Sequence, residues 1–334
     1  MEKEYKKIDI SIIVPVYNCE QYLDLFFDAL NQQVDISYEV IFINDGSTDD
    51  SLNKLNYFKQ KHDNCTVIDQ KNQGVSVARN VGLNVACGEW IYFADADDFL
   101  DSKQLGLWLC KAKENELDCL IGNGFSFKEL DTYDRSNILL KKQPWGRILS
   151  GREWIISAVN AKEWPHFCWL QLTKRSLIET NKLRFAEGKT QDVHTDILWT
   201  TELALVCQRL GFYKDPTYGY RISNTSSLTK DASHSGAMKR IKSYQLIISA
   251  ILALSLKEKE LVKVALLQQM KRELREMISL MMKKLSPSSE RRHLAREIIK
   301  KGMLKILFIR PLKFSELWKA IRYSFIIYYF RVMG

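Results

Sequence analysis

The sequence lacks any long hydrophobic run and any closely spaced pair of cysteines. Its longest uncharged apolar stretch runs from Tyr244 to Leu256, which is 13 residues, whereas a membrane-spanning helix needs about 20. None of its seven cysteines forms a CxxC pair, which argues against a disulfide framework or a zinc site and favours a reducing compartment. The first residues, MEKEYKKIDI, contain no apolar h-region, so we expect no secretory signal. Any membrane contact is therefore expected to be peripheral.

Disorder and a disulfide-stapled miniprotein are also excluded. The chain has 334 residues, of which 46% are hydrophobic and 27% charged, so it is able to bury a substantial core. This length predicts about two domains.

The net charge of +9 is unevenly divided along the chain. Residues 1–234 contain 27 Lys and Arg against 33 Asp and Glu, a net charge of −6. Residues 235–334 contain 22 Lys and Arg against 7 Asp and Glu, a net charge of +15. This asymmetry predicts a neutral-to-acidic working domain followed by a basic part that meets an anionic surface.

The first hundred residues alternate between buried strands and amphipathic helices. Apolar runs predict strands within 8–18, 38–44, 65–70 and 89–98. Helical spacing predicts helices over 19–32, 49–61 and 74–86. The resulting β-α-β-α-β-α-β order predicts an α/β fold with a mostly parallel sheet and helices on both faces.

Polar residues follow each predicted strand where the strand ends. In open α/β sheets, ligands bind outside the carboxyl ends of the strands, so we expect the four strand ends to lie at one edge. They are Pro15-Val16-Tyr17-Asn18, Asn44-Asp45-Gly46-Ser47, Lys71-Asn72-Gln73-Gly74 and Asp95-Ala96-Asp97-Asp98.

Three carboxylates crowd the end of the fourth predicted strand. Asp95, Asp97 and Asp98 follow the apolar run IYFA with no basic neighbour in the local sequence. Such carboxylates repel one another unless a cation joins them, and a hard divalent ion completed by substrate phosphates suits them. We interpret Asp98 as part of a solvated turn rather than as a ligand. Arg79, in the helix that opens after Gly74, is the nearest basic candidate, and guanidinium pairs bidentately with phosphate oxygens.

The four segments VPVYN, NDGSTDD, NQGVSVARNVGL and FADADD resemble the successive motifs of family 2 glycosyltransferases, which have the GT-A fold. Each short motif is weak alone, but all four in order, each at a predicted strand end, are specific. The resemblance implies that Tyr17 and Asp45, with Pro15 in the same nucleotide-binding set, hold the base of a nucleotide-sugar donor. Asn44 departs from the family's more frequent Asp at that position.

The resemblance also implies how the donor's remaining parts are bound. Asp95 would contact the ribose or the metal, and Asp97 would ligate Mn²⁺ or Mg²⁺, bridging to the diphosphate. Arg79 would approach the ribose or diphosphate, and Arg221 the leaving diphosphate.

The stretch from Phe167 to Thr200 resembles the second half of the same family. Gln191-Asp192 occupies the place of a Glu-Asp pair whose aspartate is the general base, so Asp192 is the candidate base. Gln191 removes a neighbouring charge that would raise the pKa of that aspartate. Asp196 is a rival candidate for the base, and His194 is a further candidate because histidine can act as a base near neutral pH.

The segment from Pro216 to Thr229 resembles the family's closing strand and loop. Ser226, Ser227 and His234 then lie either in a loop over the site or in a plain surface loop.

Residues 235–334 read as a helical, basic extension. Basic residues and aromatics interleave from Met303 to the end, which is typical of an interfacial membrane anchor. The alternatives are packing on the catalytic domain or on a second subunit. Nucleic-acid binding is disfavoured because no such motif is present. We therefore divide the chain into 1–234, a GT-A domain with a donor half to residue 100 and an acceptor half from 101, and 235–334, a membrane-associating tail.

The resemblance implies an inverting, metal-dependent transferase that moves one sugar from a nucleotide sugar, most simply a UDP-sugar, to a glycan. A lipid-linked or lipopolysaccharide acceptor, in bacterial surface-glycan assembly on the inner face of the cytoplasmic membrane, suits the basic tail. The alternative is a non-catalytic subunit of a membrane-bound assembly complex. A sugar-nucleotide pyrophosphorylase would need a Gly-rich loop after the first strand, and a processive synthase would carry a QxxRW motif; neither is present. The oligomeric state stays open.

Overall fold

The computed structural model describes residues 7–101, 103–128, 135–187, 193–223, 233–285, 289–309 and 314–333. The chain divides into two compact units. The first consists of Met1–Lys189 with Trp199–Asn224, and the second of Thr190–Leu198 with Thr225–Gly334. The short segment Thr190–Leu198 thus belongs to the second unit, although the sequence analysis placed it in the catalytic domain.

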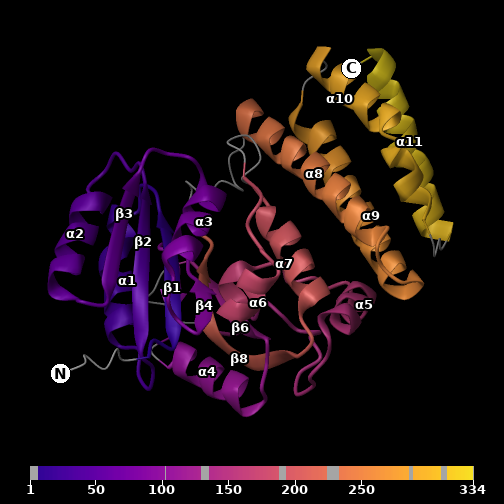
Figure 1. Cartoon of the computed structure of the whole chain (residues 1–334). Helices are drawn as coiled ribbons and strands as arrows, with labels where there is room; N and C mark the ends of the chain where they lie inside the picture. The colour runs from indigo at the N-terminus through magenta and orange to yellow at the C-terminus, as the bar shows by residue number, and fades with distance from the viewer. Residues whose placement is uncertain are drawn as a thin grey trace. The chain divides into compact units, whose positions relative to one another are not determined.

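The first unit is built on an eight-stranded sheet in the order β3-β2-β1-β4-β7-β6-β8-β5 (Figure 1). Its strands are β1 (Ile10–Val16), β2 (Tyr38–Asp45), β3 (Cys65–Gln70), β4 (Trp90–Phe93), β5 (Phe99–Leu100), β6 (Cys119–Phe127), β7 (Gln171–Lys174) and β8 (Leu210–Arg221). The first four are mutually parallel where they pair. The predicted α/β fold is confirmed, and the four predicted strands of the first hundred residues are all present.

Helices connect the parallel strands as predicted. The connecting helices are α1 (Glu20–Asn31), α2 (Ser51–Lys61) and α3 (Val75–Val85). Further along the chain come α4 (Gln104–Glu114), α5 (Gly151–Ala161), α6 (Arg175–Thr180) and α7 (Thr195–Val206). The amphipathic pattern of α1 explains its position, since Leu23, Phe26 and Leu30 are buried on one face. A capping box of Ser150 and Glu153 starts α5.

The second half of the sheet is mixed. β7 pairs antiparallel with both β4 and β6, β5 pairs antiparallel with β8, and β6 pairs parallel with β8. The mostly parallel arrangement therefore holds for the first half of the sheet, and antiparallel pairs extend it. This extension places the end of β8 beside β5 and the turn that follows β4.

The core lies along the central strands. Ile12, Ile13, Val14, Val40 and Phe42 have no exposed surface. The near-continuous apolar runs of β1 and β2 are expected for strands covered on both faces.

The second unit is helical. It contains α8 (His234–Ser255), α9 (Glu260–Lys284), α10 (Ser289–Lys300), the 3-10 helix η2 (Met303–Phe308) and α11 (Phe314–Met333). α8 packs on α9, α10 packs on α11, and η2 contacts α9, α10 and α11. The predicted helical extension is confirmed. No helix in the described part of the chain combines the length and hydrophobicity that crossing a membrane requires.

Candidate active site

The carboxyl ends of β1 and β2 lie at the same edge of the sheet, and hydrogen bonds join the loops that follow them. Val16 and Asn44 are partners in the parallel register. The side-chain oxygen of Asn18 accepts from the backbone N–H of Thr48 at 2.8 Å, and the Ser47 hydroxyl accepts from the backbone N–H of Asn18 at 3.1 Å. These bonds fix the backbone next to Tyr17, so the predicted strand-end cluster is assembled as the sequence suggested.

Asp45 is buried at the end of β2 and holds the loop that precedes α3. One carboxylate oxygen accepts from the backbone N–H of Gln73 and from the Gln70 amide, each at 2.8 Å. The other accepts from the backbone N–H of Gly74 at 2.8 Å. Asp45 therefore organises two strand ends at once, and its contact with a nucleotide base stays a prediction.

Tyr17 and Pro15 lie on the β1 side of the same edge. Pro15 is the partner of Ile43 in the register, and Tyr17 is half-exposed just beyond the strand. The neighbouring Cys19 thiol has its pKa raised to about 12, first by burial and then by the charge of Asp97. The loop after β1 and the turn after β4 are thus close in space.

Arg79 and Asp95 form an ion pair at this edge. A guanidinium nitrogen of Arg79 lies 3.0 Å from a carboxylate oxygen of Asp95. The Arg79 side chain is almost fully buried and its guanidinium lies 5.1 Å from the centroid of the Phe185 ring. The structure therefore brings Arg79 to the carboxylate cluster, as predicted, and fixes its orientation from two sides.

A second arginine reaches the same turn from β8. The Nε of Arg221 donates to the backbone carbonyl of Asp97 at 2.7 Å, and its backbone N–H donates to Asp98 at 2.8 Å. Its guanidinium lies 5.0 Å from the ring of Tyr22 and 4.7 Å from that of Phe127. The sequence analysis placed Arg221 near the leaving diphosphate, and the structure places it against the Asp95–Asp98 turn.

The interpretation of Asp98 as part of a solvated turn is wrong. Its carboxyl group is buried and accepts from the Tyr218 hydroxyl at 2.6 Å as well as from Arg221. Burial raises the pKa of Asp98 well above its usual range, and the charges of Asp97 and Asp95 raise it further. Asp98 fastens the turn to β8 and so orients Asp95 and Asp97.

The Asp95–Asp97 pair suits a hard divalent cation. Both supply oxygen ligands, which Mg²⁺ prefers, and their charges act together on the buried Asp98. Among the residues that the structure describes, no three His, Cys, Asp or Glu side chains gather closely enough to hold a metal by themselves. An ion at this turn would therefore need further ligands from the substrate, which a diphosphate provides.

Asn80 is a site residue that sequence reasoning missed. It lies on the buried side of α3 and binds both the backbone N–H and the carbonyl of Phe185, each at 2.9 Å. Its amide also donates to Glu187 at 2.9 Å. The available signal was that Asn80 directly follows the candidate Arg79 in the predicted helix. Asn80 thereby holds the segment that leads to Asp192.

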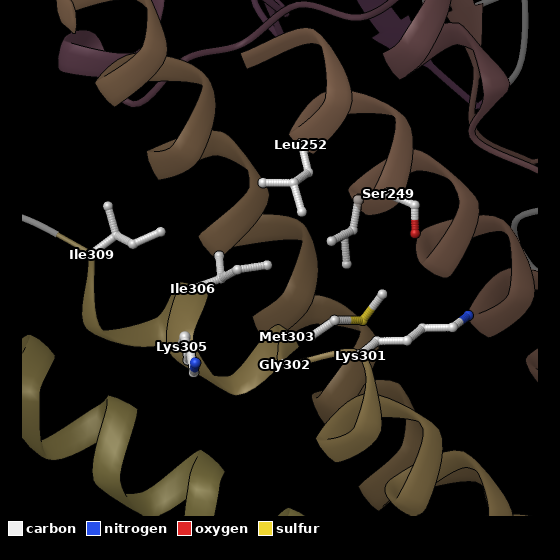
Figure 2. A pocket seen from close by; sticks show the side chains of 9 residues that line it. Ser249, Leu252, Lys301, Gly302, Met303, Lys305, Ile306 and Ile309 are labelled. Carbon is white, nitrogen blue, oxygen red and sulfur yellow. The ribbon is translucent and has the colours of Figure 1, made fainter. Parts of the chain in front are cut away.

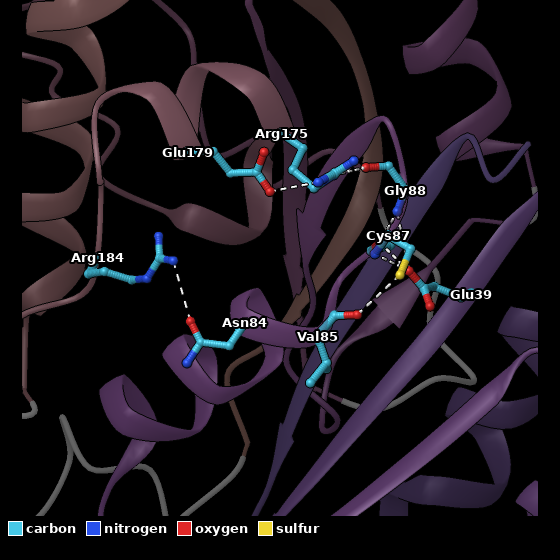
Figure 3. Close-up of polar contacts among 9 residues, drawn as sticks. Glu39, Asn84, Val85, Cys87, Gly88, Arg175, Glu179 and Arg184 are labelled. Carbon is cyan, nitrogen blue, oxygen red and sulfur yellow. Dashed lines mark hydrogen bonds and ion pairs between the residues drawn. The ribbon is translucent and has the colours of Figure 1, made fainter.

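Polar contacts also join the segment from Arg175 to Arg184 to α3 and to the start of β4 (Figure 3). Arg184 donates to Asn84 at 3.3 Å, and Arg175 donates to the Gly88 carbonyl at 2.7 Å while pairing with Glu179 at 2.6 Å. The acceptor half is thus fixed to α3 and to the start of β4.

The predicted base Asp192 lies outside the described residues, as do Gln191, Ser226 and Ser227. The residues that follow Asp192 belong to the helical unit and are anchored there. The Ser243 hydroxyl donates to the Val193 carbonyl, and the His194 ring stacks on Tyr244 with 5.0 Å between centroids. His194 is thus a packing residue here, and Asp192 against Asp196 stays open.

Asp196 and His234 are both described. Asp196 stands in the first turn of α7, and its charge contributes to the raised pKa of the buried Glu273. His234 is the first residue of α8 and its ring lies 2.7 Å from a carboxylate oxygen of Glu290. Its placement in a loop was therefore wrong, because helix α8 begins earlier than the sequence pattern indicated.

A cavity of about 350 Å³ lies within the helical unit rather than at the strand ends (Figure 2). Leu252, Met303, Ile306 and Ile309 give it an apolar lining, with Lys301 and Lys305 beside them.

Comparison with known proteins relates the first half of the chain to a known family. Residues 11–169 match the model of glycosyl transferase family 2. The chain is 31% identical over 218 residues to the uncharacterized glycosyltransferase YibD of Escherichia coli K12, covering 65% of this chain and 62% of YibD. It is 39% identical over 117 residues to the poly(ribitol-phosphate) beta-glucosyltransferase of Bacillus spizizenii, covering 34% of this chain and 18% of that protein. The chain thus spans less than two thirds of the length of these relatives.

Solved structures share the fold. The crystal structure of S. aureus TarS 1–349 is similar with a TM-score of 0.66 at 18% identity, covering 97% of this chain and 91% of that one. TarS 1–349 in complex with UDP-GlcNAc gives 0.56 at 18% identity, covering 97% and 92%. The mannosyltransferase PcManGT of Pyrobaculum calidifontis, in complex with GDP-Man and Mn²⁺, gives 0.54 at 16% identity, covering 98% and 88%. Residues 11–169 therefore match glycosyl transferase family 2, and the chain shares the GT-A fold of these solved glycosyltransferases.

Proposed function

We propose that the protein is an inverting, metal-dependent glycosyltransferase that moves one sugar from a UDP-sugar to a glycan acceptor. The observation that carries this proposal is the convergence of Arg79 from α3 and Arg221 from β8 on the Asp95–Asp98 turn. A turn with two half-buried carboxylates and two nearby guanidinium groups suits a diphosphate and its cation. The complexes of TarS with UDP-GlcNAc and of PcManGT with GDP-Man and Mn²⁺ support the same assignment by their common fold.

The donor's parts would be held by separate strand ends. Tyr17, half-exposed beyond β1, offers a ring for stacking on the base. Arg79 and Arg221 each present a planar donor set to phosphate oxygens. A divalent ion held by Asp95 and Asp97 would supply positive charge to the departing diphosphate.

Transfer itself would need one base. Asp192 would take the proton from an acceptor hydroxyl while that oxygen forms a bond to the anomeric carbon. The bond from the anomeric carbon to the diphosphate oxygen breaks, and the diphosphate leaves with the electron pair. Because attack and departure occur on opposite sides, the anomeric configuration inverts and no covalent enzyme intermediate forms.

The acceptor would be a glycan of the bacterial cell surface, lipid-linked or polymeric. The poly(ribitol-phosphate) beta-glucosyltransferase among the relatives supports a surface polymer as the substrate class. The protein would act at the inner face of the cytoplasmic membrane, because the basic helical unit, whose net charge is +15 over residues 235–334, would be attracted to anionic lipids.

The experiment compares UDP release from a panel of UDP-sugars with poly(ribitol phosphate) or lipid-linked glycans as acceptors. Asp192→Asn is expected to lower turnover at least about 100-fold while UDP binding is unchanged. Asp196→Asn distinguishes the two candidate bases and is expected to retain turnover if Asp192 is the base. If no nucleotide sugar supports transfer to any of these acceptors, the non-catalytic subunit becomes the better account.

A further inference from the structure

Helix α11 presents an exposed apolar face along its whole length. The spacings of 4, 3, 4, 3 and 4 residues place one set of side chains on a single face: Phe314, Trp318, Ile321, Phe325, Tyr328 and Val332. We call these six residues the α11 stripe. Phe314 is 77% exposed, Phe325 is 73% exposed, and the other four are also exposed. At 1.5 Å per residue the stripe is about 27 Å long.

The opposite side of α11 supplies its packing. Ala320, Ile327 and Phe330 are buried there, and the guanidinium of Arg291 in α10 lies 4.2 Å from the centroid of the Phe330 ring. The helix therefore already has a packed side within its own unit. The stripe is a second apolar face, and contiguous apolar surface of this kind marks an interaction site.

The charges around the stripe are positive. Lys319, Arg322 and Arg331 are exposed on α11. The helix carries a single carboxylate, Glu316, which pairs with Lys271 of α9 at 3.2 Å. Arg322 lies four residues after Trp318 and three before Phe325, and Arg331 lies three residues after Tyr328, so both border the stripe, whereas Lys319 lies off that face. The stripe is therefore bordered by two cations, and α11 contributes no acidic residue beside them.

We propose that the α11 stripe is the surface by which the protein lies on an anionic lipid bilayer. Trp, Tyr and Phe side chains favour the boundary between headgroups and acyl chains, and the flanking cations are attracted to anionic headgroups. A second copy of the chain fits less well, because an isologous contact centred on the stripe would bring Arg322 of each copy together in a partly desolvated interface. The proposal assigns the membrane contact given under the proposed function to one face of α11. It rests on the proposed function only in supposing that the acceptor is lipid-linked.

The test is co-sedimentation of the full chain with vesicles of phosphatidylglycerol and phosphatidylcholine, compared with vesicles of phosphatidylcholine alone. The wild type is expected to bind the anionic vesicles. The double variant Trp318→Ser, Phe325→Ser should bind at least about tenfold more weakly. The double variant Arg322→Gln, Arg331→Gln should bind about fivefold more weakly for each charge removed.

A matched control removes two exposed apolar residues from elsewhere in the same unit. Leu256→Ser, Leu261→Ser fits this purpose, since these side chains are 69% and 74% exposed, and its vesicle binding should equal that of the wild type. Equal loss in the control, or no preference of the wild type for anionic vesicles, would overturn the proposal. So would a concentration-dependent dimer in light scattering that the stripe variant abolishes while vesicle binding is absent. UDP binding, measured on the same variants, separates this outcome from failure of the transferase assignment.

Discussion

The side-chain amide of Asn80 makes two 2.9 Å hydrogen bonds to the backbone of Phe185, donating to its carbonyl and accepting from its N–H. The two residues are 105 positions apart in the chain. A single buried side chain thus joins the helix that carries Arg79 to the segment that precedes Asp192. This connection adds to the hydrogen bonds of Arg184 with Asn84 and of Arg175 with the Gly88 carbonyl.

Replacing Asn80 tests that connection. Asn80→Ala leaves a buried N–H and a buried carbonyl of Phe185 without their partner, so we expect the free energy of unfolding to fall by about 3 kcal/mol. Asn84→Ala is the control, since Asn84 is an exposed residue of the same helix with one 3.3 Å bond to Arg184 (Figure 3). Its effect should stay below about 0.5 kcal/mol. Urea unfolding curves measure both, and equal shifts would contradict the structural role of Asn80.

The geometry of Arg79 predicts a specific need for guanidinium. Arg79→Lys keeps the charge but loses the planar donor set that the ion pair with Asp95 orients. We expect UDP to bind about tenfold or more weakly to this variant in calorimetry. Arg135→Lys is the control, because Arg135 forms a half-exposed ion pair with Asp101 at 2.8 Å. Thermal unfolding of both variants shows whether the fold is retained, and unchanged affinity in a folded Arg79→Lys would remove this residue from the donor site.

The buried Glu273 of α9 predicts a pH dependence of stability. The pKa of Glu273 is raised from 4.5 to about 7, mainly by burial; the charge of Arg272 opposes this shift, and the charges of Glu276 and Asp196 add to it. Since the folded pKa lies above the unfolded one, the protonated group contributes stability below pH 4.5, and this contribution is lost as the pH rises to about 7.

Glu273→Gln should therefore remove this loss. The free energy of unfolding of the variant minus that of the wild type should increase by about 3 kcal/mol between pH 4.5 and 7 and stay constant above pH 7. Glu260→Gln, an exposed residue of the same helix, should follow the wild type throughout. Parallel curves for wild type and Glu273→Gln across this range would show that Glu273 ionises normally.

The anchoring of Val193 and His194 on α8 predicts a separation of binding from transfer. Tyr244→Ala removes the ring on which His194 stacks, and Ser243→Ala removes the partner of the Val193 carbonyl. Because Asp192 immediately precedes Val193, we expect kcat to fall about tenfold in each variant while UDP affinity is unchanged. Ser249→Ala is the control, since the Ser249 hydroxyl donates to the Gln245 carbonyl within α8. Loss of UDP affinity along with kcat would point to general unfolding instead.

The sequence was sufficient for the features that depend on local pattern. The apolar runs of β1 and β2 and the amphipathic faces of the helices between them set the order of elements. The polar residues that end each strand then fall at one edge because the strands are parallel. Arg79 was correctly placed beside the carboxylates for this reason, and Arg221 came from the family resemblance.

The features that depend on contacts between residues far apart in the chain could not be predicted from the sequence. Asp98 looks like a solvated turn residue in FADADD, yet Tyr218, 120 residues later, buries it. The antiparallel strand β7 lies between β4 and β6, and no local signal gives that order. Asn80 also acquires its role only when Phe185 packs on α3. Such contacts are set by tertiary structure, which overrides the local pattern.

The proposed donor site holds a nucleotide diphosphate together with a divalent ion at the Asp95–Asp97 turn. Calorimetry of UDP with and without Mn²⁺, on wild type, Asp97→Asn and the exposed control Asp63→Asn, tests it most directly. We expect Mn²⁺ to strengthen UDP binding by at least about tenfold in the wild type and the control, and to have little effect in Asp97→Asn. Binding that is equal with and without Mn²⁺ in all three proteins, or no binding of UDP, GDP, dTDP or CMP in any of them, would contradict the account.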